Sequence, residues 1–358
     1  MKYVNIIKEL ESKYPTFGEY LDLVLEAAEQ LHNDPERLKW VEETSAYYKS
    51  CTELGSWEIT LPETDGTLLG DMLPLFILLD SVFDMIDKYI SRGFDDVDVH
   101  LQQFPRSLLA VQKRTGRPGI NQMYFEWISV FIKCMIFNCL PFRMNINRQR
   151  DGAIFLKNRH SGEKVAMMTE QKIHRSGLVF GSAGCTDEEG SFETIFEETD
   201  TEFVGHLVRN FLVEKESTRL SKSEWECVLR PGDYVICQHI PSGADLTPEK
   251  VTAAFKKAKD IVAKYYPEYN AKCIFCNTWM YNPKIAEILG EDSKIAQMGA
   301  RFLRFPIKSD ATDVFGFVFP AMYDGYESLP ENTRLERGLK KLYLEGGYLH
   351  NYAGVIID

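Results

Sequence analysis

The sequence lacks a surplus of basic side chains. Its 358 residues include 41 lysines and arginines against 53 aspartates and glutamates, which gives a net charge of −12 at neutral pH. Proteins that bind nucleic acid without sequence preference depend on basic side chains that neutralise phosphates. The charge therefore predicts that nucleic acid is not a partner, while a local site for a small anion stays compatible with it.

Long uninterrupted apolar runs are also absent. The two most apolar stretches are Leu73–Ile90, which Asp80, Asp84 and Asp87 interrupt, and Trp127–Leu140, which Lys133 interrupts. Both are expected to be core helices, so no membrane span is predicted. The N-terminus shows no basic segment followed by an apolar run, and eight cysteines are scattered along the chain. These features predict no signal peptide, reduced thiols and a cytoplasmic protein.

Several common catalytic motifs are missing. The sequence contains no G-x-S-x-G, H-E-x-x-H, G-x-x-x-x-G-K-[ST] or G-x-G-x-x-G pattern. These mark many hydrolases, zinc proteases and nucleotide-binding proteins, so the commonest motif-bearing members of those classes are excluded. One C-x-x-C pattern is present, from Cys273 to Cys276, which is typical of zinc or redox sites. Residues three apart on a strand point to opposite faces, so a structural role without a metal is favoured.

Helical periodicity dominates the first part of the chain. Leu21, Val24, Ala28 and Leu31, for example, form an apolar stripe at helical spacing. The pattern predicts helices over 1–32, from an N-cap at Asp34, over Leu68–Ile90, Pro105–Thr115 and Asn121–Phe137, and a short strand at Trp57–Thr60. A mostly helical N-terminal domain of residues 1–145 is therefore expected.

Strand patterns dominate the remainder, residues 146–358. They predict two hairpins, Gly152–Lys157 with Lys164–Thr169 and Phe302–Ile307 with Val314–Phe319. An antiparallel pair of Trp225–Leu229 with Tyr234–Ile240 and a strand Cys273–Met280 are also predicted. The tail is expected to hold one helix and a strand at Tyr352–Ile357. Helices between these strands indicate a mixed sheet with helices, an α/β or α+β domain.

A strand, a helix, a strand and a second helix follow one another between Asp233 and Pro306. Thr247 is expected as the N-cap of the first helix and Pro248 as its first residue. This order is a βαβ unit, whose strands are parallel and whose ligands favour the carboxyl ends of the strands and the helix N-terminus. A cleft is therefore predicted that is lined by Ile240, Gly243, Ala244, Thr247, Asn277, Thr278 and Trp279. The acidic Asp245 and Glu249 beside it would repel a phosphate.

Two side chains at this cleft form a candidate catalytic pair. Cys276 and His239 would make a thiol–imidazole pair if their strands adjoin. The alternative is a small buried thiol and a hydrogen-bonded core histidine.

Three phrases in this region are distinctive: His239-Ile-Pro-Ser-Gly-Ala-Asp-Leu-Thr-Pro-Glu249, Cys276-Asn-Thr-Trp-Met-Tyr-Asn-Pro-Lys-Ile-Ala-Glu287 and Phe302-Leu-Arg-Phe305. Together with Gly116-Arg-Pro-Gly119 and Leu329-Pro-Glu-Asn332, they resemble a family of bacterial two-domain N-acyltransferases. Its members have a helical N-terminal domain and a C-terminal domain similar to the GNAT superfamily. The likeness covers most of the chain.

The resemblance implies a fold and an activity. The fold is α/β (α+β), a helical N-terminal domain followed by a GNAT-like mixed-sheet domain. Its strands 4 and 5, here Tyr234–Ile240 and Cys273–Met280, splay apart around the arm of an acyl thioester, and strands 6 and 7 form the hairpin at Phe302–Ile307 and Val314–Phe319. Backbone N–H groups of strand 4 polarise the acyl carbonyl. The implied activity moves an acyl group from the thioester to the amine of a small molecule or peptide.

The sequence departs from the superfamily at the pyrophosphate loop. Where Gln/Arg-x-x-Gly-x-Gly/Ala is usual, this chain has Ile240-Pro-Ser-Gly-Ala-Asp245, so acyl-CoA and an acyl-carrier protein are both open as donors. Asn277 replaces a histidine of many relatives, and Tyr281 is a candidate acid for the leaving thiolate, or a partly exposed tyrosine at a helix start. Two further functions stay open: a non-catalytic GNAT-like ligand-binding or regulatory protein, and a thiol hydrolase that uses Cys276.

Overall fold

The chain divides into two compact units, Met1–Phe137 and Asn138–Asp358. The computed structural model describes residues 1–51, 58–94, 96–271, 273–319 and 323–357. The division falls within strand β1 (Ile136–Cys139), and the predicted domain boundary between residues 145 and 146 lies inside strand β2 (Phe142–Arg148). Within the described ranges, no helix combines the length and the apolar character that a bilayer span requires.

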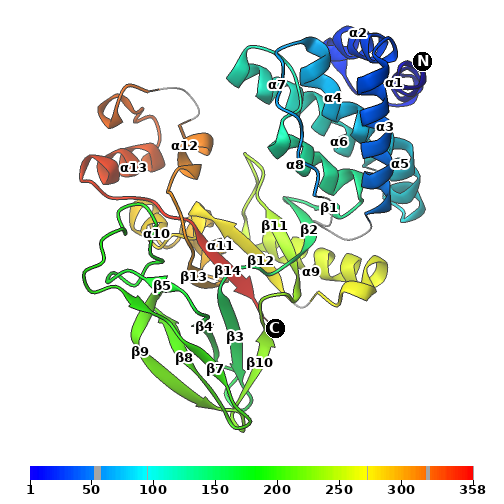
Figure 1. The fold of residues 1–358 in the computed structure, drawn as a ribbon. Coiled ribbons are helices and arrows are strands. Elements are labelled where there is room, and N and C mark those ends of the chain that lie inside the picture. Colours follow the sequence, from blue (N-terminus) through cyan, green and yellow to red (C-terminus); the bar gives the residue numbers. More distant parts are fainter. Residues whose placement is uncertain (52–57, 95, 272, 320–322, 358) are drawn as a thin grey trace. The chain divides into compact units, whose positions relative to one another are not determined.

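The first unit is built from helices, as predicted (Figure 1). Asp34 caps one of them, because its Oδ1 accepts the backbone N–H of Arg37 over 3.1 Å. Gly116 ends another with a left-handed φ of +81°. The helices are α1 (Lys2–Lys13), η1 (Gly18–Tyr20), α2 (Leu21–His32), α3 (Pro35–Ser50), α4 (Leu68–Leu79), α5 (Val82–Ser91), α6 (Val97–Leu101), α7 (Gln103–Thr115) and α8 (Gln122–Ile132).

Two helix predictions for this unit need correction, and the predicted strand Trp57–Thr60 lies partly outside the described residues. The single helix expected over Leu68–Ile90 is two, because the chain turns at Asp80, whose carboxylate pairs with lysines of α1 and α3. The helix expected to reach Phe137 ends at Ile132, since Cys134 takes a φ of +55° that a helix does not accommodate. Trp57 lies outside the described residues, and residues 58–60 are not in a strand.

The second unit contains two larger sheets and one short pair of strands (Figure 1). The central sheet has the order β1 (Ile136–Cys139), β2 (Phe142–Arg148), β11 (Tyr234–His239), β12 (Ile274–Thr278), β14 (Tyr352–Ile356), β13 (Leu303–Pro306). The second sheet has the order β10 (Trp225–Leu229), β3 (Ala153–Asn158), β4 (Lys164–Met168), β8 (Glu202–Arg209), β7 (Phe196–Glu198), with β9 (Leu212–Ser221) also paired to β8. The short pair is β5 (Lys172–Ile173) with β6 (Phe192–Glu193).

Helices accompany the central sheet. They are α9 (Pro248–Tyr265), η2 (Pro267–Tyr269), η3 (Trp279–Tyr281), α10 (Lys284–Leu289), α11 (Lys294–Gly299), α12 (Asp313–Phe317), η4 (Tyr326–Ser328) and α13 (Arg334–Leu344). One face of the sheet packs on the second sheet, where Phe155 and Phe305 meet with ring centroids 5.4 Å apart. The other face carries α9, whose Phe255 stacks on Phe142 at 5.6 Å. Strands buried on both faces in this way hold their register firmly.

The predicted βαβ unit and the hairpin of β3 with β4 are confirmed, since β11 and β12 are parallel and β3 and β4 antiparallel. Two other pairings are wrong. Val314–Phe319 is largely helix α12, and β13 pairs instead with β14, across the intervening residues 307–351. The strand Trp225–Leu229 pairs with β3 and not with Tyr234–His239, because the turn at Pro231–Gly232 carries the chain from one sheet to the other.

Replacing Gly354 by alanine should lower the free energy of unfolding. A Cβ there would stand 2.9 Å from Cβ of Phe302 and 3.2 Å from Cδ2 of Tyr281, so Phe302 and the Tyr281 ring must shift, at a cost of about 1–3 kcal/mol. Urea denaturation measures this loss. Gly316→Ala is the control, because no atom lies within 4 Å of the new Cβ and its φ is ordinary. Equal stability of Gly354→Ala and the wild-type chain would contradict the packing described.

Candidate active site

Strands β11 and β12 pair only over a short distance. Their parallel register joins Ile236 with Ile274 and Cys237 with Phe275. β11 nevertheless continues to His239, paired with β2, and β12 continues to Thr278, paired with β14. In the described residues, the two strands therefore leave a gap between their carboxyl ends, which we call the strand gap.

The hydroxyl of Tyr281 joins the two strands where the strand gap begins. Tyr281 ends η3, and its hydroxyl donates to Oε1 of Gln238 over 3.1 Å and is also hydrogen-bonded to the Cys276 thiol. The ring is fully buried and packs on Phe302, with centroids 4.6 Å apart. Burial, with the nearby Cys276 thiol adding to it, raises the pKa of Tyr281 well above its ordinary value. The phenol therefore stays protonated at neutral pH and holds a hydroxyl proton where the strand gap begins.

The structure does not bring Cys276 and His239 together. Gln238 and Cys276 both contact the Tyr281 hydroxyl and so lie on the same face of the sheet. His239, the next residue after Gln238, therefore points to the opposite face from Cys276. Burial raises the pKa of the Cys276 thiol to about 12. An activated thiolate needs the reverse shift. Cys276 and His239 therefore fit the alternative to a catalytic pair, in which Cys276 is a buried thiol and His239 a hydrogen-bonded histidine.

His239 is held by a neighbouring strand. Its Nε2 lies 2.7 Å from Oδ1 of Asn145 on β2, so this nitrogen donates and the neutral ring carries its proton there. Burial, assisted by the charge of Arg143, lowers the pKa of His239 to about 4. The imidazole is neutral at pH 7.

The two thiols of the C-x-x-C pattern diverge as strand geometry predicts. Cys273 packs in the core between the sheets, whereas Cys276 faces Tyr281. Among the residues that the structure describes, no group of three or more histidine, cysteine, aspartate or glutamate side chains is arranged to hold a metal ion.

A tight turn leads from β11 into α9. The backbone N–H of Ala244 donates to the carbonyl of Pro241 over 3.1 Å, and Gly243 takes the left-handed φ of +75° that favours glycine. Thr247 is the N-cap and Pro248 the first helical residue, as predicted. The Thr247 hydroxyl makes no cap bond; its backbone N–H donates to Oδ1 of Asp245 over 3.2 Å.

Two lysines offset the acidic charge at the start of α9. The carboxylate of Asp245 pairs with Nζ of Lys250 at 2.7 Å and with Nζ of Lys294 at 3.2 Å. Hydrogen bonds from these lysines hold the pKa of Asp245 well below its usual range. The repulsion of phosphate expected from Asp245 is therefore reduced. Lys294 comes from α11, and nothing in the sequence near Asp245 signals it.

Of the residues predicted to line the cleft from the side of β12, only some are accessible. Asn277 is exposed at the end of β12, and Oγ1 of Thr278 accepts the backbone N–H of Met280 over 3.2 Å. Trp279, predicted to line the cleft, is 4% exposed and packs in a core cluster with Val314 and Leu339. Because η3 turns this side chain toward α12 and α13, the indole packs in the core behind the cleft and does not line it.

Two contributors were missed at the sequence level. Gln238 occupies a strand position between apolar neighbours on a buried face, which is a readable signal for a buried polar contact. Arg304 donates from Nη1 to the carbonyl of Tyr281 over 3.1 Å, and its guanidinium lies 4.2 Å over the ring of Phe211. Arg304 therefore positions the end of η3.

Solved structures of acyltransferases share the fold of the whole chain. One is an acyltransferase mutant in complex with octanoyl-CoA, with a TM-score of 0.64 and 14% identity over 98% of this chain and 87% of that one. Another is an acyltransferase in complex with decanoyl-CoA and teicoplanin, with a TM-score of 0.62, 14% identity and the same coverage. At this identity the likeness shows the fold alone.

No curated protein matches the sequence. The family model described as "GNAT-like C-terminal domain" matches residues 163–356. These residues include β4 and every later strand, and so contain the strand gap, α9 and η3. Because the match spans more than half of the chain, the protein belongs to the family of the GNAT-like C-terminal domain.

Proposed function

We propose that the protein transfers an acyl group from a thioester, either acyl-CoA or an acyl-carrier protein, to the amine of a small molecule or peptide. The observation that carries this proposal is the strand gap, where β11 and β12 lose their pairing beside the Tyr281 hydroxyl. Family membership supports it, as does the shared fold with acyltransferases that bind octanoyl-CoA, decanoyl-CoA and teicoplanin.

The donor would lie with its thioester in the strand gap. Backbone N–H groups at the end of β11 would polarise the acyl carbonyl, and the turn from Ile240 through Gly243 and Ala244 to Thr247 would follow the phosphate-bearing arm. Lys250 and Lys294 stand beside the α9 N-terminus and supply positive charge for those phosphates. Asn277 and Thr278 would line the opposite side.

The reaction forms a C–N bond and breaks a C–S bond. The amine nitrogen attacks the thioester carbonyl, and the resulting oxyanion is held by the β11 amides until the thiolate leaves. Tyr281 gives its hydroxyl proton to the thiolate, and solvent returns a proton to the phenolate. The proton lost by the amine passes to Nδ1 of His239, directly or through water, because Nε2 already donates to Asn145. His239 then releases this proton to solvent, which balances the proton that solvent returns to the phenolate. The products are an amide and a free thiol.

We also propose that the protein works in the cytoplasm. Acyl-CoA and acyl-carrier thioesters are intracellular metabolites, and the eight cysteines are all free in the structure, the state that a reducing compartment maintains.

Purified protein should release thiol from an acyl-CoA only when an amine is present. We would offer acyl-CoA of acetyl to palmitoyl length, acyl-carrier protein and a panel of amines and amino-terminal peptides, and detect the amide by mass spectrometry. Turnover should be saturable and favour a limited range of chain lengths, because a shaped site discriminates by about 1–3 kcal/mol per misfitting methylene. Saturable thioester binding without any amide would identify a non-catalytic GNAT-like binding protein and contradict acyl transfer.

Tyr281→Phe should lower kcat by about 100-fold with little change in KM, because only the proton transfer to the thiolate is lost. The matched control is Tyr343→Phe. Tyr343 is also a buried tyrosine, but its hydroxyl has no hydrogen-bond partner in the described part of the chain, so activity should stay at the wild-type level. An unchanged kcat for a folded Tyr281→Phe protein would remove Tyr281 from the mechanism.

The stability of the protein below neutral pH should report on His239. Burial lowers its pKa from 6.5 to about 4, so between these values the unfolded chain binds a proton that the folded chain does not. This stabilisation is complete above pH 6.5 and is lost as the pH falls toward 4. The free energy of unfolding of His239→Gln should therefore decline less steeply over that range than the wild type in urea titrations.

Identical slopes for wild type and His239→Gln would show that His239 titrates alike in the folded and unfolded states.

A further inference from the structure

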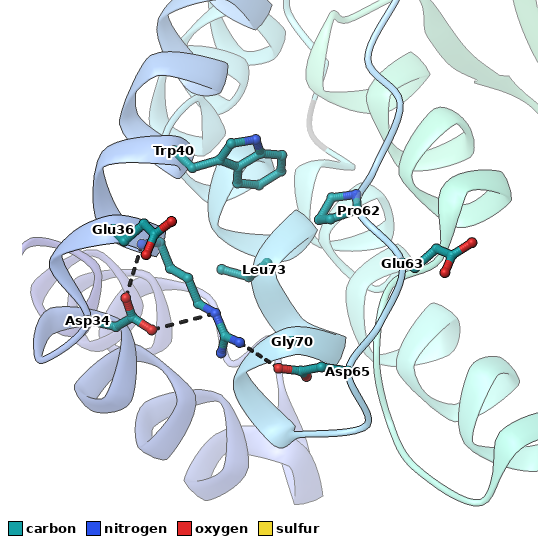
Figure 2. Close-up of a pocket in the computed structure, with 9 residues that line it drawn as sticks. Asp34, Glu36, Trp40, Pro62, Glu63, Asp65, Gly70 and Leu73 are labelled. Carbon is teal, nitrogen blue, oxygen red and sulfur yellow. Dashed lines mark hydrogen bonds and ion pairs between the residues drawn. The ribbon is translucent and has the colours of Figure 1, made fainter.

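The helical first unit contains a pocket of about 450 Å³ that the proposed acyl transfer does not use. It lies between α3, the start of α4 and the extended segment that precedes α4, and Figure 2 shows the residues around it. Its volume falls within the range of small-molecule sites, about 300–1,000 Å³.

Apolar side chains from three elements form the walls of this pocket. Trp40 on α3, Pro62 on the extended segment and Leu73 on α4 surround one space in Figure 2. Trp40 is half-buried against the unit's core, so its indole is held in place while one side stays open. The indole gives this pocket an aromatic wall on which a flat apolar group can pack.

The pocket is preformed because its extended segment is tied down. Asp65 accepts the backbone N–H of Thr67 over 3.0 Å and pairs with Nη2 of Arg37 at 2.5 Å. The backbone N–H of Leu61 donates to Oε1 of Gln122 over 3.0 Å. A ligand would therefore not need to order this segment on binding, which favours affinity.

The charged residues that line the pocket determine which charge a ligand can carry. Among the described residues that line the pocket, Arg37 is the one basic residue, and its guanidinium already pairs with Asp65 and with Asp34 at 3.5 Å. Glu36 and Glu63 also line the pocket, and neither pairs with a basic side chain in the described residues. The lining thus carries four carboxylates against one guanidinium, and an anion would be repelled.

We propose that this pocket binds an organic cation, an apolar or aromatic group that carries an ammonium. The apolar part lies between Trp40 and Pro62 over Leu73, where the indole attracts the positive charge. The ammonium pairs with Glu36, which stands on the same helix one turn before Trp40. The Glu63 carboxylate points away from Trp40 in Figure 2, so it contributes only to the negative electrostatic potential around the pocket. The site does not depend on acyl transfer.

The test is calorimetric titration of the full chain with three probes of one shape: 2-phenylethylammonium, 2-phenylethanol and phenylacetate. At low salt the ammonium should bind saturably, with a dissociation constant on the order of a millimolar. The alcohol should bind at least about fivefold more weakly because it forms no ion pair or cation–π contact. The acetate should show no binding.

Variants locate the binding. Trp40→Ala should weaken binding of the ammonium by about tenfold, and Trp40→Phe, which keeps a ring to pack on the core, by less. Glu36→Gln should weaken it by about two- to fivefold. Glu42→Gln is the matched control and should stay within about twofold, since Glu42 is exposed on the same helix and is not among the residues that line the pocket.

Three results would overturn the proposal. One is no saturable heat with 2-phenylethylammonium up to about 20 mM. Another is equal affinity for the alcohol and the ammonium, which would show that charge is not recognised. The third is unchanged affinity in folded Trp40→Phe and Glu36→Gln proteins, which would place the binding elsewhere.

Discussion

The short parallel pairing of β11 and β12 is the constraint on which the proposed chemistry depends. The strands share a register at two positions and then separate, while each keeps its outer neighbour, β2 or β14, along its full length. Antiparallel pairing on the outer sides therefore holds the strand gap open, because closing it would break two existing ladders. An opening fixed by the sheet itself needs no reorganisation when a thioester enters, which is the requirement for electrostatic stabilisation of a carbonyl.

The Tyr281 hydroxyl depends on its packing for its position. Gly354 leaves space on β14 for the rings of Tyr281 and Phe302, and Arg304 holds the carbonyl of Tyr281 from the sheet edge. The buried hydroxyl then satisfies its hydrogen-bonding capacity with one residue from each strand, Gln238 and Cys276. A group fixed by several contacts keeps the geometry that proton transfer requires.

Local sequence signals predicted the parts of the fold that local chemistry decides. Pro248 after a cap residue, and β-branched strands on either side of α9, identify the βαβ unit directly. The partner of β13 was not predictable in this way, because β14 lies beyond residues 307–351 and pairing at that distance leaves no local pattern. The short apolar run from Val314 to Phe319 resembles a buried strand in sequence, yet packing against α13 makes most of it helical.

The site was predictable in place but less so in detail. The carboxyl ends of β11 and β12 follow from the parallel order of the strands. Whether His239 and Cys276 share a face depends on a register that no single strand encodes, since a shift of one residue reverses every side chain. The pairing of Lys294 with Asp245 is likewise a tertiary contact between exposed side chains.

Hydrogen–deuterium exchange with and without a non-reactive thioether analogue of octanoyl-CoA tests the central claim most directly. The account predicts slower exchange at saturation in two segments, residues 238–249 and 277–281, which border the strand gap from either side. Protection there would place the donor between β11 and β12. Saturable binding that leaves both segments unprotected would contradict the account, because the thioester would then lie outside the gap.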